Sequence, residues 1–368
     1  MVQRTDVFVI GGGPAGLAAA IAARKKGFHV TVADGAQPPI DKACGEGLMP
    51  DALAALRELG VDVSAEGYAL RGVRFLGAGC QVTASFPSGH GIGIRRLTLH
   101  EKLVEQAQAC GISLLWKTPV NAICGDGVVV AGEVVAAKWI VGADGIRSRV
   151  RRWCKLDAHT RYECRYAFRR HYRVKPWSDF MEVYWGENAQ AYVTPVGEEQ
   201  VCVVLISRRP GMRFVSLDAE FPKLALRLER AAHASTERGA TTVMRRLKSV
   251  HRDRVALIGD ASGSVDAITG EGLCLSFRQA ITLAEALEAG DLSRYQEAHR
   301  RLARRPMLMG RILLLLDGRT DLRDRTMRAL ASDADIFSRL VAHHVGATSS
   351  PAHLASTGAL LGWRFVAA

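Results

Sequence analysis

A glycine-rich turn near the start of the chain constrains its fold more than any other sequence feature. Gly11, Gly13 and Gly16 form a G-x-G-x-x-G motif that directly follows the apolar run 6–10 and opens an alanine-rich segment. In this setting Gly11 permits a tight turn, Gly13 lets the backbone approach a pyrophosphate, and Gly16 allows close helix–sheet packing. The sequence therefore predicts a strand–turn–helix unit that binds a dinucleotide, with its phosphates at the N-terminus of the helix.

The residues after the motif extend this unit. Pro14 and Ala15 open a helix predicted to reach residue 26, and a second buried strand is expected at 30–33. Asp34 follows that strand, and a carboxylate at this place can accept hydrogen bonds from a ribose. We therefore expect Pro14, Ala15 and Asp34 to contact the dinucleotide together with the three glycines.

The composition is that of a globular protein. The chain has 368 residues, of which 48% are apolar and 23% are charged, which is enough for about two domains. No stretch approaches the roughly 18 consecutive apolar residues of a membrane span, so we expect a soluble protein. Eight cysteines are spread without a CxxC pair, so we predict neither a metal site nor a disulfide framework.

The charge distribution leaves several anionic partners open. A net charge of +12 would attract a dinucleotide, an anionic substrate, a membrane surface or nucleic acid. Segment 294–328 carries ten arginines against four acidic residues. It predicts either a peripheral membrane contact through an amphipathic helix or a closing helix with a solvated arginine face. Because the sequence has no recognisable nucleic-acid-binding motif, we expect no nucleic-acid binding. The N-terminus has no export signal, which favours a cytoplasmic protein.

Further elements are predicted along the chain. Helices are predicted at 50–59, 98–109, about 272–289 and beyond residue 294. β-rich stretches are predicted at 128–141, 181–206 and 255–258. Thr98 and Glu101 have the spacing of a capping box at the start of their helix. The stretches 128–141 and 181–206 are interpreted as sheet material separate from the first unit.

Two later segments carry a family resemblance. Residues 142–145 (Gly-Ala-Asp-Gly) and 259–260 (Gly-Asp) each follow an apolar run. With the first motif, and in this order, they resemble the FAD-binding motifs of aromatic hydroxylases of the para-hydroxybenzoate hydroxylase type. The resemblance implies that the cofactor is FAD, with Asp144, Gly259 and Asp260 among its contacts. It also implies that NAD(P)H supplies the electrons without a second dinucleotide domain.

Each of these polar residues also has an alternative role. Asp144 beside a glycine can be a turn former, and Asp260 can cap a helix. Arg95 and Arg96 precede a predicted helix and resemble the family's arginine at the adenine-dinucleotide end. We select Arg96, whose guanidinium can bind the pyrophosphate bidentately, against the alternative of a solvated arginine.

Two further segments resemble the geranylgeranyl reductase branch of this superfamily. One is the Cys-Gly-Glu-Gly stretch 44–47 and the other is the Thr-Gly-Glu-Gly-Leu stretch 269–273. Both correspond to loops beside the flavin ring, so Cys44 and Glu46 are candidate catalytic residues. The resemblance adds the following cofactor-binding residues: Gly270, Glu271, Gly272 and Leu273. As alternatives, Cys44 is a buried small hydrophobe, and the two glutamates anchor the loops to each other or to Lys42.

The middle of the chain departs from that branch. Its reductases carry Tyr-x-Trp-x-Phe-Pro in the substrate cavity, whereas segment 190–195 keeps only the proline and one aromatic residue. This difference favours hydroxylation of a polar ring over saturation of an alkene. The predicted pocket residues, which are alternatively ordinary sheet core, are Tyr184, Trp185, Tyr192, Thr194 and Pro195.

The fold predicted from these observations is α/β. It has a discontinuous Rossmann-type FAD-binding domain, a β-sheet substrate domain and a helical C-terminal segment. The predicted FAD-binding domain comprises residues 1–73, 91–154 and 250–293. The substrate domain comprises 74–90 and 155–249, and the C-terminal segment comprises 294–368.

The predicted function is that of an FAD-dependent oxidoreductase. The leading hypothesis is an NAD(P)H-dependent monooxygenase that hydroxylates a hydrophobic aromatic or polyketide-like metabolite. The first alternative is a reductase of C=C bonds in an isoprenoid or other lipid. The second is a membrane-associated binding factor that contains flavin. His90, His171 and His251 are candidate bases by residue type alone, and the sequence does not specify an oligomeric state.

Overall fold

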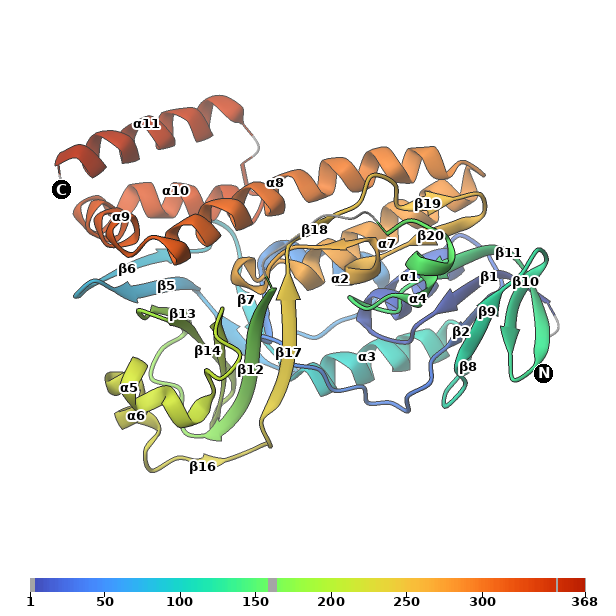
Figure 1. Cartoon of the computed structure of the whole chain (residues 1–368), viewed down its shortest axis with the longest axis horizontal. Coiled ribbons are helices and arrows are strands. Elements are labelled where there is room, and N and C mark those ends of the chain that lie inside the picture. Colours follow the sequence, from blue (N-terminus) through green and yellow to red (C-terminus); the bar gives the residue numbers. More distant parts are fainter. Residues whose placement is uncertain (1–3, 158–163, 349, 368) are drawn as a thin grey trace.

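Buried parallel strands form the first layer of the structure, which is a computed structural model that describes residues 4–157, 164–348 and 350–367. The strand order is β19-β20-β11-β1-β2-β8, with β10 and β9 added to β11 (Figure 1). The strands are β1 (Arg4–Ile10), β2 (Val30–Ala33), β8 (Ser113–Leu115), β9 (Val120–Ile123), β10 (Gly127–Val130), β11 (Glu133–Gly142), β19 (His251–Arg252) and β20 (Val255–Leu257). Apolar residues of β1 are buried on both faces of the sheet, as expected for a central parallel strand.

Helices cover this sheet. They are α1 (Pro14–Lys25), α2 (Pro50–Leu59), α3 (Arg96–Ala109), α4 (Arg149–Trp153) and α7 (Gly272–Glu288). Helix α1 packs against α7 and α3 through small and aliphatic side chains such as Leu17 and Ile21, which are fully buried. This packing fixes the N-terminal ends of α1 and α7 on the same side of the sheet as the carboxyl ends of its strands.

A second sheet also has eight strands and is called the large sheet here because most of its strands are longer (Figure 1). Its order is β16-β12-β15-β14-β13-β5-β6, with β17 beside β12. The strands are β5 (Gly72–Gly77), β6 (Cys80–Ser85), β12 (Cys164–Arg173), β13 (Phe180–Trp185), β14 (Ala189–Gly197), β15 (Gln200–Ser207), β16 (Ala232–His233) and β17 (Arg238–Val243). Alternate residues face opposite sides. Ala191 and Val203 pack beside α5 (Leu217–Glu220) and α6 (Pro222–Leu228), whereas Tyr192 and Val204 face the C-terminal helices.

Short elements connect the two sheets. The strands β3 (Gly47–Leu48), β4 (Tyr68–Leu70) and β7 (Gly91–Gly93) form a three-stranded sheet, and β18 (Arg245–Arg246) pairs with β21 (Gly263–Ser264). The 3-10 helices are η1 (Phe214–Ser216), η2 (Gly259–Ser262) and η3 (Ala267–Thr269). Strand β21, η2 and η3 belong to the loop that leads from β20 to α7.

Four helices complete the chain. They are α8 (Leu292–Gly318), α9 (Thr320–Ser332), α10 (Ala334–His344) and α11 (Pro351–Ala367). The long helix α8 starts against α7 and runs to the far end of the large sheet, where α9 and α10 pack on β6 (Figure 1). Among the described residues, no helix is both long enough and apolar enough to cross a membrane.

Two local predictions are wrong. The proposed capping box fails because α3 begins at Arg96, which makes Thr98 its third residue, and no side chain of its own caps it. A carboxylate from another loop serves instead, because Glu46 Oε1 accepts a 3.0 Å hydrogen bond from the Arg96 N–H. The stretch 128–141 is not separate sheet material, since β11 pairs directly with β1.

The predicted α/β fold is confirmed. The first sheet is built from three separate parts of the chain, residues 4–33, 113–142 and 251–257, and the large sheet from the intervening segments. The domain boundaries themselves stay a prediction.

Candidate functional site

A continuous cavity of about 860 Å³ connects the two sheets with the C-terminal helices. One end lies at the glycine-rich turn after β1, beside Gly13 and Asp34. The middle passes Cys44 and the loop from β20 to α7, and the other end reaches apolar side chains of α8 and α10, such as Leu313 and Phe337. The predicted cofactor-binding residues that line it are Gly11, Gly13, Pro14, Ala15, Asp34, Arg96, Asp144, Asp260, Gly270, Gly272 and Leu273.

The turn after β1 requires glycine at two positions. Gly11 has φ +114°, and an added Cβ would lie 2.5 Å from the Ala143 carbonyl oxygen. At Gly16 an added Cβ would lie 1.8 Å from the Gly11 carbonyl oxygen, so only glycine allows α1 to start so close to the turn. Gly16 packs against the Gly11 carbonyl and does not line the cavity, whereas Gly11, Gly13, Pro14 and Ala15 do.

Side chains from elsewhere hold this turn in place. Asp34 Oδ2 accepts a hydrogen bond of 2.7 Å from the Gly12 N–H, and Oδ1 accepts one from Ala36. His100 of α3 is fully buried, and its Nε2 donates to the Gly12 carbonyl at 2.8 Å. Burial lowers the pKa of His100, so the ring is neutral at pH 7. His100 was not predicted as a site residue, because nothing in its local sequence indicates a contact with residue 12.

The cavity wall fits a bound dinucleotide. An added Cβ at Gly13, Gly45 or Gly272 would meet no atom within 4 Å, so these backbones face open space along the cavity. The Nε of Arg96 is buried and finds no hydrogen-bond partner among the described residues. Since Arg96 also lines the cavity, an anionic ligand such as a pyrophosphate would satisfy it. When bound, FAD supplies hydride and electron transfer at its ring.

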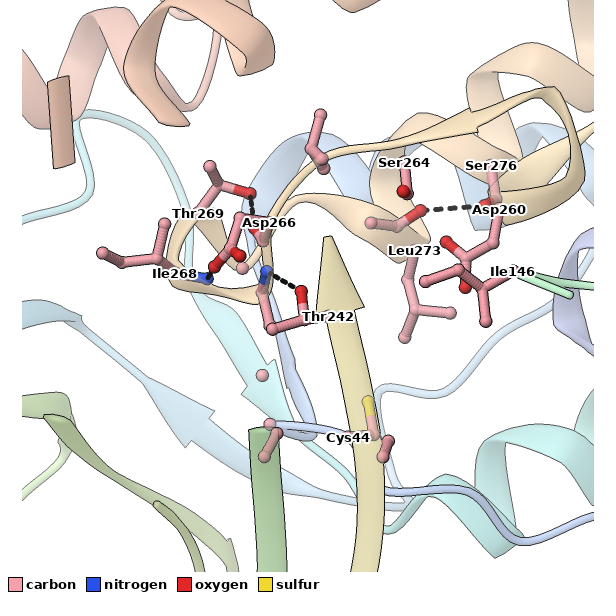
Figure 2. Close-up of a pocket in the computed structure, with 18 of the residues that line it drawn as sticks. Cys44, Ile146, Thr242, Asp260, Ser264, Asp266, Ile268, Thr269, Leu273 and Ser276 are labelled. Atoms are coloured by element: carbon pink, nitrogen blue, oxygen red, sulfur yellow. Dashed lines mark hydrogen bonds between the residues drawn. The ribbon is translucent and has the colours of Figure 1, made fainter. Parts of the chain in front are cut away.

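The loop between β20 and α7 forms the wall opposite Cys44 (Figure 2). Gly259 has φ +60°, and its N–H donates to Gln279 of α7, which fixes the turn beside Asp260. Asp260 Oδ2 forms an ion pair with Lys42 Nζ at 3.0 Å. The side chain of Glu271, the N-cap residue of α7, forms no capping hydrogen bond, so the N–H groups at this end of the helix can stabilise negative charge on a ligand.

Asp144 serves mainly the protein backbone. Its carboxylate accepts hydrogen bonds from the Ser148 hydroxyl and from the N–H groups of Arg149 and Val150, which places it at the N-terminus of α4. The turn-forming alternative thus has direct structural support, although Asp144 also lines the cavity.

Glu46 is buried at the centre of a polar network. It has the left-handed φ of +60°, its carbonyl accepts from Ile94, and its Oε2 accepts a 2.6 Å hydrogen bond from His171 Nε2. His171 Nδ1 in turn accepts from Ser235 at 2.8 Å. Burial lowers the pKa of His171, so the ring is neutral. Both oxygens of Glu46 are therefore occupied by protein donors, which fits a positioning role for this side chain.

Cys44 and Cys202 both lie beside this network, and the Cys202 thiol contacts the Cys44 carbonyl oxygen at 3.6 Å. Cys44 is half-buried and lines the cavity, and its sulfur accepts from the Glu46 N–H at 3.4 Å. Cys202 is buried in β15, with its sulfur within 4.8 Å of a carboxylate oxygen of Glu46 and a ring nitrogen of His171. Burial raises the pKa of Cys202 well above its ordinary value, so the thiol is protonated and poorly suited to bind a metal.

Glu271 points away from the cavity. Its Oε1 accepts from Arg305 Nη2 at 3.1 Å, and the same nitrogen contacts Asp51 Oδ2 at 3.2 Å. The side chain of Glu271 is 1% exposed, and its Oε2 lies 3.6 Å from Nδ1 of His344 in α10. Glu271 therefore anchors the loop to α8, and the alternative of an anchor to Lys42 is wrong because Lys42 pairs with Asp260.

The predicted pocket residues separate between the two faces of the large sheet. Tyr192 lines the cavity and donates its hydroxyl hydrogen to the Ile268 carbonyl at 3.1 Å. Tyr184 faces the other side, where it donates to Glu182 at 2.6 Å, because successive residues of a strand alternate. The predicted residues that lie outside the cavity wall are Tyr184, Trp185, Thr194 and Pro195.

A buried ion pair beside the cavity was not predicted from the sequence. Arg165 of β12 and Asp266 are both 1% exposed and are joined at 2.8 Å. Asp266 Oδ1 also accepts from the Ile268 N–H, which shapes the loop that faces Cys44 (Figure 2). The local sequence of Arg165, which contains several further arginines, gave no sign that this side chain would reach residue 266.

Comparison with known proteins identifies the family. A family model described as an FAD binding domain matches residues 4–290. The chain belongs to this family. It is thus an FAD-dependent oxidoreductase, as the order of its three motifs predicted.

Similar proteins differ in their named reactions. The chain is 30% identical over 321 residues to the menaquinone reductase of Mycobacterium tuberculosis (strain ATCC 25618 / H37Rv), with 78% of each chain covered. It is 26% identical to the aurachin C monooxygenase/isomerase of Stigmatella aurantiaca, covering 79% of this chain and 84% of that protein. The crystal structure of a geranylgeranyl bacteriochlorophyll reductase-like protein from Thermoplasma acidophilum has the same fold, with a TM-score of 0.76 and 21% identity over 97% of this chain and 99% of that one.

Proposed function

We propose that this flavoprotein reduces a C=C bond in a long, apolar lipid of the isoprenoid type. The observation that carries the proposal is the extension of the cavity beyond Cys44, away from the glycine-rich turn. There it is lined by apolar side chains from the large sheet and from three C-terminal helices. These residues are Val73, Phe75, Met181, Val183, Val204, Ile206, Leu308, Ile312, Leu313, Leu330, Phe337 and Val341.

This lining favours a hydrocarbon chain over a compact polar ring. Each methylene group removed from water contributes about 0.8 kcal/mol, so an elongated apolar cavity is selective for a long chain. The similarity to the menaquinone reductase supports the same substrate class. The expected polar wall at Tyr192 and Thr194 loses its support, because Thr194 lies outside the cavity and the Tyr192 hydroxyl already bonds to Ile268.

Cys44 is our candidate for the residue that delivers the proton in this reaction. Saturation of a C=C bond requires a hydride on one carbon and a proton on the other. The Cys44 thiol faces the cavity opposite the loop with Asp266, whereas the acids nearby already have partners. Loss of the proton would leave a thiolate that solvent reprotonates. The electron donor is proposed to be NAD(P)H, on the strength of the resemblance to single-domain flavin hydroxylases.

Monooxygenation of a hydrophobic aromatic compound is the second candidate. The similarity to the aurachin C monooxygenase/isomerase supports it. In that case the apolar cavity would exclude water from the reduced cofactor and hold an aromatic ring beside it.

One experiment separates the two candidates. The FAD-loaded enzyme, reduced with NADPH or NADH, is incubated with a menaquinone that has an unsaturated side chain, without oxygen and then with it. The product is analysed after its ring has been reoxidised in air, because reduction of a quinone to a quinol also adds two hydrogens. A product that then still carries two additional hydrogens supports C=C reduction, whereas a product that gains one oxygen atom only in air supports monooxygenation. In addition, the flavin spectrum after rapid mixing of the reduced enzyme with oxygen tests whether the enzyme activates oxygen, as monooxygenation requires. An enzyme that holds FAD but gives neither product with any reductant would contradict both.

A further inference from the structure

The outer face of α8 exposes apolar side chains to solvent. Leu308, Ile312 and Leu315 are 46%, 45% and 52% exposed, and their spacing places them on one face of the helix. Gly310 and Leu313, on the opposite side of α8, are buried against the rest of the protein. A stripe of large apolar residues on an otherwise solvated helix face indicates a surface that meets an apolar partner.

Arginines are interleaved with this stripe. Arg301, Arg304 and Arg311 are exposed, and helical spacing places them on the same face as Leu308 and Leu315. Among the described residues, none of these three arginines is paired with an acid. The face therefore combines positive charge with apolar groups, the pattern of a helix that lies in a membrane interface.

The cavity opens at the edge of the same face. Leu308 and Ile312 are exposed and also line the cavity, as does Gly358 of α11 on the other side of the opening. Beyond Gly358, α11 continues with mostly apolar residues, and Trp363 near its end is 73% exposed. Tryptophan is enriched at membrane–water interfaces, where its ring sits at the level of the headgroups.

We propose that the face formed by Arg301, Arg304, Leu308, Arg311, Ile312 and Leu315 docks the enzyme on an anionic lipid bilayer. A lipid substrate then enters the cavity between α8 and α11 without crossing water. This route of entry rests on the proposed function, whereas the docking surface does not. Anionic headgroups would pair with the arginines, and the leucines would insert among the acyl chains.

Charge favours a bilayer over a second copy of this chain. A copy would present the same arginines and repel them, and the whole chain carries a net charge of +12. An anionic bilayer instead supplies both the opposite charge and an apolar layer below it.

The test uses the full-length, FAD-loaded protein and sedimentation with vesicles of phosphatidylcholine, with and without phosphatidylglycerol. Leu315→Glu, which alters the stripe outside the cavity, should lower binding to the anionic vesicles at least about tenfold. The matched control is Leu226→Glu. Leu226 is 72% exposed in α6, on the other side of the large sheet, and its replacement should not change binding. Replacing all three arginines with glutamine should lower binding about a hundredfold, since each contributes about fivefold near an anionic surface.

Two results would overturn the proposal. One is a wild-type protein that does not sediment with anionic vesicles at low ionic strength, and the other is equal binding by the Leu315→Glu and Leu226→Glu variants. A dimer in light scattering that Leu315→Glu dissociates would assign the face to a second copy instead. If the wild-type enzyme binds vesicles but does not reduce detergent-dispersed lipids, only the proposed function is contradicted. The docking surface is then still supported.

Discussion

Glu46 Oε2 accepts a hydrogen bond of 2.6 Å from Nε2 of His171, which joins the loop beside the cavity to the large sheet. The other oxygen of Glu46 caps α3 through the Arg96 N–H. One buried carboxylate thus fixes three elements around the cavity: the loop that presents Cys44, the helix that presents Arg96, and strand β12. This arrangement explains why a residue with a left-handed φ is tolerated here, since its partners offset the strain.

Replacing Glu46 tests whether it positions the loop or takes part in the chemistry. Glu46→Gln should retain an acceptor for the Arg96 N–H, but its amide NH2 group would face the Nε2–H of His171, so we expect kcat within about tenfold of wild type and a loss of stability of about 2 kcal/mol. Glu46→Ala should cost about 3 kcal/mol, because two buried donors lose their acceptor. Urea unfolding and steady-state kinetics measure the two effects. A stable Glu46→Gln enzyme with normal FAD content and no turnover would instead make Glu46 a catalytic residue.

Gly13→Val should abolish flavin binding without unfolding the protein. An added Cβ at Gly13 meets no protein atom within 4 Å, so the new side chain would fill the space expected for the pyrophosphate. We expect FAD affinity to fall by at least about a hundredfold, or about 3 kcal/mol, and the purified protein to be colourless. The control is Gly211→Val, at another open position that lies outside the cavity. Yellow Gly13→Val protein with normal flavin content would refute the assignment of the turn.

Local patterns predicted the elements of the dinucleotide unit well. Strand β2 and helix α2 begin and end where the sequence placed them, because buried apolar runs, Pro50 and Gly60 define their limits locally. The start of α3 was misplaced because its N-terminal cap is Glu46, a residue distant in sequence. Local sequence patterns do not report such tertiary contacts.

The candidate site was predictable only in part for the same reason. Glycines that face the cavity follow a motif, whereas Tyr184 was assigned to the wrong face because the strand register could not be read from its sequence. His100 and Arg165 act through partners that are far away along the chain. Their roles follow from the packing of α3 and β12.

Acid should destabilise the protein through His299. This histidine is buried, its Nε2 lies 2.9 Å from the Ser262 hydroxyl, and burial lowers its pKa from 6.5 to about 4. Between these values the unfolded chain binds more protons than the folded protein, so stability is complete above pH 6.5 and falls as the pH decreases towards 4. The loss at pH 4 is about 3 kcal/mol.

His299→Gln should flatten this part of the pH profile. Urea unfolding of the variant between pH 4 and 7 measures the slope. His29→Gln, at an exposed position, is the control and should leave the slope unchanged. An unaltered slope in His299→Gln would assign the acid sensitivity to other groups.

Phe75 should limit the length of the hydrocarbon chain that the cavity accepts. Met181 and Val183 of β13 line the cavity, but Trp185, the next residue on that face, does not. Phe75 lies against Trp185 with ring centroids 5.8 Å apart and against Phe337 of α10 at 4.9 Å, so these rings close the end of the cavity.

Phe75→Ala should therefore extend the cavity by about the volume of a phenyl ring, at a cost of about 3 kcal/mol in stability. We expect kcat/KM for a substrate with one more isoprene unit to rise about tenfold relative to the shorter substrate. Phe168→Ala is the matched control, because Phe168 packs on the opposite face of the same sheet. A similar change in preference in both variants would attribute the effect to general loosening of the sheet and would contradict a length limit set by Phe75.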